Sequence, residues 1–335
     1  MGNHCGAQED DIWKVKWSSL NNFGFTISSD MLKQKRELDI LDKIRILKQQ
    51  ITDFENAASI LYDKVKPYTG PKVVVYGGTK ECYDKMEISV KTLLANSKVD
   101  KIIFLINTEE FPIPLPDIVE VINTAEQPYY FPWGFNNMYS ISYMTMMRHV
   151  LYDMFPQYDR ILWLDVDTLV MDDISGIFDS HLGDYYYFAA VKEDRHYLKY
   201  TSARKIEDIP EGYHDLMLEP STYYNAAVLL ENLKLLRDSG MGEQLVNRLN
   251  NYLIYYSDQT LINEMCRDRI LTLDYEWNTS HATGEVRMPR IIHVSSGKRT
   301  DAMNDIINRY KDVSFDDIME WRKKREEMGV MNGKK

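Results

Sequence analysis

Two aspartates one residue apart are the feature of this sequence most suggestive of chemistry. The run Leu164-Asp165-Val166-Asp167 ends a hydrophobic segment that begins at Arg160, so both carboxylates follow a predicted strand. Hard divalent cations prefer oxygen ligands, and a carboxylate pair at a strand end can hold a cation that also carries substrate phosphates. Two solvated turn carboxylates would give the same pattern, and it is the strand context that favours a metal site.

Two further runs place polar side chains where an apolar segment begins. Asn225 stands at the entrance of an apolar run, and Asp258 and Gln259 begin a helix-like segment. Capping of a turn or of a helix N-terminus explains these residues nearly as well as a binding role does.

A fourth run ends in an imidazole followed by two cations. His293 closes a short apolar strand, and Lys298 and Arg299 come a few residues later. Neutral imidazole is a common metal ligand, and cationic side chains bind phosphate. We therefore expect His293 as a third ligand beside the two aspartates, and either Lys298 or Arg299 as a phosphate partner.

Short apolar segments alternate with helix-like segments from residue 72 onward, and these elements must position the polar residues. The predicted strands are Val73–Tyr76, Lys101–Ile106, Ile118–Ile122, Arg160–Leu164 and Phe188–Val191, and one predicted helix spans Met138–Phe155. This alternation predicts a parallel α/β sheet. Such sheets bind ligands at the carboxyl ends of their strands.

Residues 1–71 read as a separate extension. Apolar residues recur every three or four positions from Ile40 to Val65, which predicts a long amphipathic helix with a period near 3.5 residues. The helix either joins two copies of the chain through residues 40–65 or lies on its own chain. We divide the chain into an extension at 1–71, a main domain at 72–312 and a helical tail at 313–335.

The order and spacing of these runs resemble glycosyltransferase family 8, which includes bacterial galactosyl- and glucosyltransferases and the glycogenins. The runs that carry the resemblance are VVVYGGT, a helix ending at Arg148, LDVDTLV, YYNAAVLLENLKLLR, SDQTLINEM and IIHVSSGK. They cover roughly residues 72–300. The stretch from Arg148 to Asp165 matches the family in length without a gap.

The resemblance implies a GT-A fold, which is a single, mostly parallel, Rossmann-like sheet flanked by helices. It implies a UDP-hexose donor, a divalent cation that is usually Mn²⁺ with Mg²⁺ as the alternative, and retention of anomeric configuration. The implied acceptor is a hydroxyl on a carbohydrate, a lipid-linked glycan or a protein. In glycogenin the acceptor is the protein itself, and the many tyrosines of this chain keep self-glycosylation open. A catalytically silent sugar-nucleotide-binding scaffold is the remaining alternative.

Individual residues also acquire roles through the resemblance. The implied metal ligands are Asp165, Asp167 and His293. The implied catalytic residues around the donor sugar are Gln259, Asp258 and Asn225. The implied donor-binding residues are Gly77, Gly78, Thr79, Tyr83, Arg148, Asp165, Val166, Ala226, Gly297 and Lys298, with Tyr83 near the position that stacks on uracil.

The chain departs from the family pattern in four places. The loop after the first strand carries Gly78-Thr79 where the family has an acidic residue, and Ala227 replaces a glycine. Around Gly297 the glycine and lysine are shifted by one position. The acidic residue that the family has after Val191 is either Glu193 or Asp194 here.

Composition excludes several classes of protein. The chain has 335 residues, a net charge of −11 and 44% hydrophobic residues, so it is too apolar to be disordered and too acidic to neutralise nucleic-acid phosphates. It has no apolar run long enough for a membrane helix and no apolar N-terminal leader. Its three cysteines are far apart, which favours a reducing, cytoplasmic location.

Overall fold

The computed structural model describes residues 40, 43–45, 47–53, 67–131, 136, 142–193, 223–252, 254, 257–280, 288–294 and 300–328. The chain forms two compact units, Met1–Val65 and Lys66–Lys335. In the first unit all described residues, which lie between 40 and 53, are helical. The apolar side chains of Ile40, Ile44, Leu47 and Ile51 on that helix are exposed. The rest of the predicted helix, residues 54–65, lies outside the described residues.

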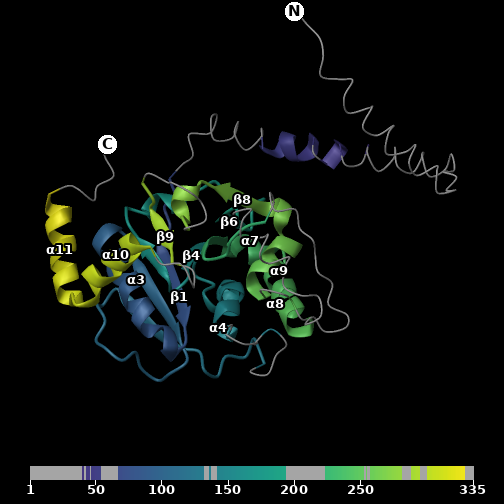
Figure 1. Ribbon diagram of the computed structural model, residues 1–335. Helices are drawn as coiled ribbons and strands as arrows, with labels where there is room; N and C mark the ends of the chain where they lie inside the picture. The colour runs from purple at the N-terminus through teal and green to yellow at the C-terminus, as the bar shows by residue number, and fades with distance from the viewer. Residues whose placement is uncertain are drawn as a thin grey trace, which may run out of the picture. The chain divides into compact units, whose positions relative to one another are not determined.

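A seven-stranded sheet forms the centre of the second unit (Figure 1). In spatial order its strands are β3 (Val119–Asn123), β2 (Lys101–Ile106), β1 (Val73–Gly78), β4 (Arg160–Leu164), β7 (Val228–Asn232), β6 (Phe188–Val191) and β8 (Ile270–Leu273). All neighbours are parallel except where β7 pairs antiparallel with β4 and β6. The expected α/β architecture with a mostly parallel sheet is therefore confirmed.

Strand β7 has a direct consequence for the site. Its first residue, Val228, pairs with Leu164, the last residue of β4. Because the two strands run in opposite directions, the residues that enter β7 lie beside the residues that leave β4. Asp165 donates its backbone N–H to the Ala227 carbonyl at 2.8 Å across this junction.

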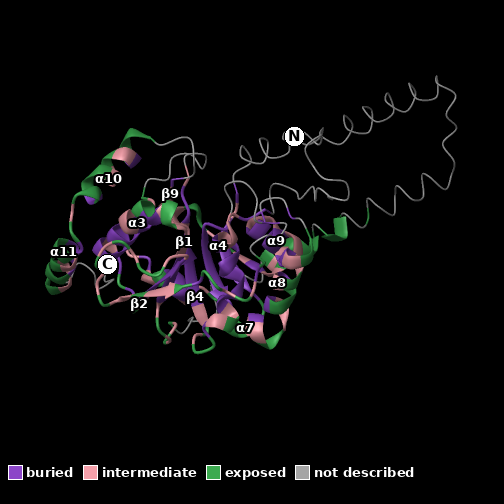
Figure 2. Cartoon of the chain, turned by 90° about the horizontal axis from the view of Figure 1, so that it is seen from below, coloured by how far each residue is buried: buried purple, intermediate pink, exposed green. Residues whose placement is uncertain are grey.

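Helices cover both faces of the sheet (Figure 1). On one side lie α3 (Tyr83–Asn96), α10 (Asp301–Lys311) and α11 (Phe315–Glu327), and on the other lie α4 (Tyr143–Met146), α5 (Leu151–Met154), α7 (Leu233–Asp238), α8 (Met241–Asn251) and α9 (Ser257–Met265). The residues of β1, β2, β4, β6 and β7 are almost all buried between these layers, as expected in a doubly covered sheet, whereas the edge strands β3 and β8 are partly exposed (Figure 2). Among the described residues no helix is both long and apolar enough to span a bilayer.

The predicted helix Met138–Phe155 is not continuous. Helix α4 begins after Ser142, whose side chain caps the Met144 N–H, and residues 137–141 lie outside the described residues. A 3-10 segment, Met147–Val150, then separates α4 from α5. Within this segment the Arg148 Nε donates to the Thr145 carbonyl at 2.8 Å.

A two-stranded antiparallel sheet accompanies the main one. It pairs β5 (Thr168–Val170) with β9 (Ile291–His293), and Thr168 stands opposite His293. The C-terminal helix α11 packs onto the same unit, because Phe315 and Ile318 enter the core and Arg325 donates to the Ala95 carbonyl at 2.7 Å.

Candidate active site

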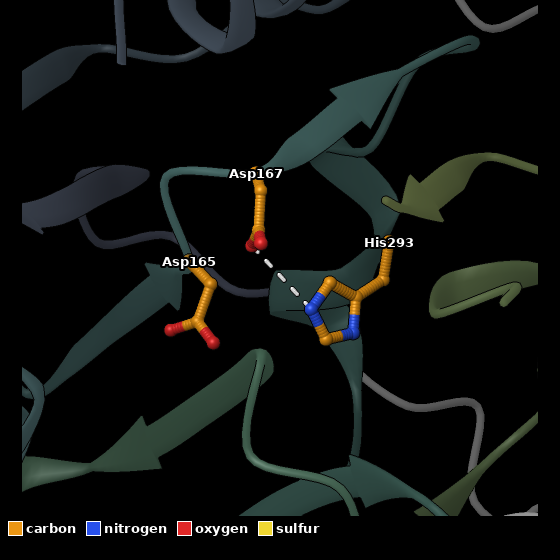
Figure 3. A group of neighbouring side chains, drawn as sticks. All are labelled: Asp165, Asp167 and His293. Carbon is orange, nitrogen blue, oxygen red and sulfur yellow. Dashed lines mark ion pairs between the residues drawn. The ribbon is translucent and has the colours of Figure 1, made fainter. Parts of the chain in front are cut away.

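Asp165, Asp167 and His293 converge where β4 ends (Figure 3). Each offers a ligand atom, and these three atoms lie within 4.8 Å of one another. The convergence follows from backbone pairing, since β9 sets His293 opposite Thr168, and Val294 donates its N–H to the Asp167 carbonyl at 2.8 Å. The structure thus brings together the three residues expected as metal ligands.

Asp167 and His293 form a partly buried ion pair. The Nε2 of His293 lies 3.4 Å from Oδ1 of Asp167, along the dashed line in Figure 3. Burial alone would lower the pKa of His293, but the carboxylates of Asp167, Asp165 and Glu193 together outweigh it and the pKa is raised. Burial alone would likewise raise the pKa of Asp167, and the imidazole lowers it instead. Each group therefore stabilises the charged form of the other.

Arg148 links the aspartate cluster to the start of α9. It is 1% exposed, its Nη2 donates to Asp165 Oδ1 at 2.7 Å, and its Nε lies 3.2 Å from Asp258 Oδ2. Its Nη1 donates to the Ala226 carbonyl. The guanidinium lies over the Trp163 ring, 4.8 Å from the centroid. Arg148 therefore joins three parts of the expected site from a buried position.

Trp163 also fixes Asp165, a contact that the sequence did not suggest. Its indole Nε1 donates to Asp165 Oδ1 at 2.8 Å. Room for this indole comes from Gly77 at the end of β1, where a Cβ would overlap the Trp163 ring. Position 77 therefore requires glycine, because the Trp163 ring lies so close to the backbone there. By leaving room for Trp163, Gly77 also helps to hold Asp165 in place.

Asp258 lies at the beginning of α9 in a strained turn. It follows Ser257, a non-glycine residue with a φ of 30°, and Ser257 Oγ donates to Asp258 Oδ1 at 3.0 Å. Burial raises the pKa of Asp258, while Arg148 opposes the rise and Asp165 adds to it. A buried carboxylate with a cation beside it can accept hydrogen bonds from sugar hydroxyls.

Two side-chain amides form the next part of the site. Asn225 follows the Lys192–Tyr224 bridge at the entrance to β7, and its Nδ2 donates to Glu193 Oε2 at 2.7 Å. Gln259 donates from Nε2 to the same oxygen at 3.4 Å. The acidic residue after Val191 that reaches these amides is Glu193, whereas Asp194 lies outside the described residues.

The end of β1 lies close to the aspartate turn. A Cβ on Gly78 would be 3.2 Å from a methyl carbon of Val166, so these two expected donor-binding residues are neighbours. Thr79 follows directly and precedes the 3-10 turn Lys80–Cys82. Tyr83 begins α3, its ring packs against Phe111 and it is 6% exposed, so its stacking role stays a prediction.

Asn278 is a site residue that the sequence did not reveal. It is 4% exposed, and its Nδ2 donates to Asn225 Oδ1 at 2.8 Å. No motif identifies it, because the contact joins segments far apart in the chain. Gly297, Lys298 and Arg299 lie outside the described residues, so the choice between Lys298 and Arg299 stays open.

Comparison with known proteins agrees with this arrangement. The model of glycosyl transferase family 8 matches residues 79–306. The glycosyltransferase GlyB of Streptococcus pneumoniae serotype 4 is 23% identical over 282 residues, which are 75% of this chain and 62% of GlyB. The chain therefore matches less than two thirds of this relative.

Solved structures show the fold. The glycosyltransferase GlyE of Streptococcus pneumoniae TIGR4 is 19% identical with a TM-score of 0.53, covering 76% of this chain and 64% of GlyE. The galactosyltransferase LgtC, solved with donor and acceptor sugar analogs, is 17% identical with a TM-score of 0.50, covering 75% of this chain and 99% of LgtC. These likenesses confirm the expected GT-A fold. The family match extends over more than half of the chain, and the chain belongs to glycosyl transferase family 8.

Proposed function

We propose that this chain transfers a hexose from a UDP-sugar to a hydroxyl acceptor, with retention of anomeric configuration and with the help of a divalent cation. The observation that carries the proposal is the convergence of Asp165, Asp167 and His293 at the end of β4. Arg148 contacts both Asp165 and Asp258, which ties that cluster to the amide residues near α9. Family membership supports glycosyl transfer as the reaction.

The three side chains fit a divalent cation. Two carboxylates and one imidazole form a donor set suited to Mn²⁺, with Mg²⁺ as the alternative. Asp165, Asp167 and His293 would hold the ion. A dication bound there would stabilise the negative charge that develops on the departing diphosphate.

The sugar would be handled by the polar groups beside this cluster. Asp258, oriented by Arg148 and Ser257, would accept hydrogen bonds from sugar hydroxyls. The amides of Gln259 and Asn225 would donate hydrogen bonds to oxygen atoms of the donor sugar, with Gln259 beside the anomeric carbon.

We favour a same-face displacement. An amide is a poor nucleophile, so Gln259 would orient the sugar rather than attack it. The acceptor hydroxyl attacks the anomeric carbon as the bond from that carbon to the diphosphate oxygen breaks, and the departing phosphate takes the hydroxyl proton. A covalent route through Asp258 is the alternative. We place the reaction in the cytoplasm, with a carbohydrate, a lipid-linked glycan or a protein as acceptor.

Donor hydrolysis tests the proposal. The purified chain with Mn²⁺ and UDP-glucose or UDP-galactose should release UDP slowly without acceptor, and chelation with EDTA should stop the release. Asp167→Asn should weaken Mn²⁺ binding by about 10- to 100-fold in calorimetric titration while the protein stays folded. Asp184→Asn, at an exposed aspartate, is the matched control.

Two results would contradict the proposal. One is an absence of UDP-sugar binding and turnover across a donor screen, with and without metal. The other is UDP release that continues unchanged in the presence of EDTA and in Asp167→Asn.

A further inference from the structure

Two side-chain amides of the site share one carboxylate oxygen. Asn225 Nδ2 donates to Glu193 Oε2 at 2.7 Å, and Gln259 Nε2 donates to the same atom at 3.4 Å. Glu193 is the second residue after β6 and is 9% exposed, so it meets these amides from a largely buried position. An ionised carboxylate only accepts hydrogen bonds, so each amide must turn its nitrogen toward Glu193.

The opposite end of each amide meets a backbone N–H. Ala227 donates to Asn225 Oδ1 at 2.9 Å, and Ala226 donates to Gln259 Oε1 at 3.1 Å. A backbone N–H only donates, so it selects the oxygen of each amide. The carboxylate and the two successive N–H groups therefore specify the same orientation for both side chains.

Asn278 adds a second donor to one of these oxygens. Its Nδ2 donates to Asn225 Oδ1 at 2.8 Å, so this oxygen receives bonds from both Ala227 and Asn278. An amide oxygen has two lone pairs. Both are occupied here, and Asn225 can therefore meet a sugar only through its N–H.

We propose that Glu193 is a positioning residue of this site, which holds the amides of Asn225 and Gln259 in the single orientation that presents their nitrogen atoms to the carboxylate and to the donor sugar. This inference rests on the proposed function, because it takes the sugar to lie against these amides. Without the carboxylate, the Gln259 oxygen still accepts from the Ala226 N–H, but this single bond holds the amide less firmly, and a half-turn would exchange donor and acceptor toward the substrate. Asn225 keeps two donors on its oxygen, so we expect Gln259 to be the amide that rotates. Misplaced contacts of this kind slow a reaction more than they weaken binding.

The test compares Glu193→Gln with Glu193→Asp. The glutamine variant has nearly the same shape but replaces one acceptor oxygen by an NH₂ group and removes the charge that strengthens both bonds, whereas the aspartate variant keeps an acceptor-only carboxylate. For Glu193→Gln we expect kcat for UDP release to fall about 10- to 100-fold with the donor KM changed less than about threefold. Glu193→Asp should recover at least part of this loss. Glu320→Gln, at an exposed glutamate on α11, should match the wild type.

Further readouts separate positioning from folding and from direct binding. The Tm of Glu193→Gln should stay within about 2 °C of the wild type. A neutron crystal structure of this variant, which locates the amide hydrogens, should show the Gln259 amide rotated. Unchanged kcat, an equal loss in both variants, a rise in donor KM without a fall in kcat, or an unrotated Gln259 amide would each overturn the inference. Failure of the wild type to release UDP from any donor would instead overturn the proposed function, and the orientation of the Gln259 amide in the variant crystal would still decide the inference.

Discussion

The ion pair between Asp167 and His293 makes metal binding depend on pH. The nearby carboxylates, with Asp167 foremost, raise the pKa of His293 against the opposing effect of burial, so the metal-free imidazole holds its proton to a higher pH than usual. A metal ligand must be the neutral imidazole, and binding therefore releases a proton. Below the pKa of His293, the Mn²⁺ affinity should rise about tenfold per pH unit, and it should level off above that pKa.

Calorimetric Mn²⁺ titration between about pH 5.5 and pH 8 measures this dependence. His293→Gln, which cannot take up a proton, should bind more weakly and lose most of the slope. An affinity in the wild type that does not change over this range would rule His293 out as a ligand.

Adding a single carbon atom at Gly77 should change both the stability of the fold and metal binding. A Cβ there would overlap the Trp163 ring and would lie 3.2 Å from the Met144 carbonyl oxygen. Gly77→Ala should lower the free energy of unfolding by about 1–3 kcal/mol, as overpacking does, and should weaken Mn²⁺ binding because Trp163 holds Asp165. Gly176→Ala has open space around the new Cβ, and urea unfolding should show a change within about 0.5 kcal/mol. Equal stability of the two variants would contradict the close approach.

Strand β7 contains an unusual buried carboxyl. Glu231 is 0% exposed, and neither of its oxygens has a hydrogen-bond partner among the described residues. Burial raises its pKa well above the ordinary value, and the nearby Arg148 only partly offsets this. A buried polar group without a partner costs about 1–3 kcal/mol of stability.

Glu231→Leu should therefore raise the free energy of unfolding by about 1–3 kcal/mol at neutral pH. Because the folded-state pKa is raised, the wild type is stabilised most when the carboxyl is protonated in both states, near pH 4 or below, and loses stability as pH rises through the folded-state pKa. The advantage of the variant should grow over the same range. Urea unfolding at several pH values measures it, with Glu120→Leu on the exposed side of β3 as control. A pH-independent difference would mean that Glu231 does not titrate as expected.

The elements were predictable where burial leaves a strong pattern. Strands β1, β2 and β4 are buried on both faces, and their continuous apolar runs identify them in the sequence. The direction of β7 was not predictable, because an apolar run reads the same in a parallel and an antiparallel strand. Strand β5, at three residues, is too short to leave a pattern, whereas the apolar run that ends at His293 did indicate β9.

Part of the candidate site could also be predicted from the sequence. Asp165, Asp167 and His293 each follow or close an apolar run that reads as a strand, and the resemblance to a family assigned the same three residues to the metal. Trp163 and Asn278 escaped prediction because their contacts to Asp165 and Asn225 depend on side-chain geometry and on long-range pairing. Arg148 was expected to bind donor, and its contacts with Asp165 and Asp258 show where it lies without testing that role.

At the scale of the whole molecule, the N-terminal helix bears on assembly. Ile44 and Ile51 belong to its apolar stripe and are exposed, and a stripe with this spacing can pair with a second copy. If this helix joins two copies, the full chain should be oligomeric in light scattering and the double variant Ile44→Lys, Ile51→Lys should be monomeric. Gln49→Lys, off the stripe, should leave the assembly intact. A monomeric wild type would favour the other interpretation, in which the helix lies on its own chain.

The junction between β6 and β7 has a consequence for variation within the family. Residues 194–222 connect two points that hydrogen bonds hold together, because Glu193 donates its N–H to the Tyr223 carbonyl at 2.8 Å and Lys192 pairs with Tyr224. Where the ends of a connection are fixed in this way, doubling its length costs only about 0.6 kcal/mol in closure entropy. Insertions or deletions between residues 194 and 222 should therefore leave the paired ends at Lys192 and Tyr224 in place, and with them the strands that lead to the aspartates.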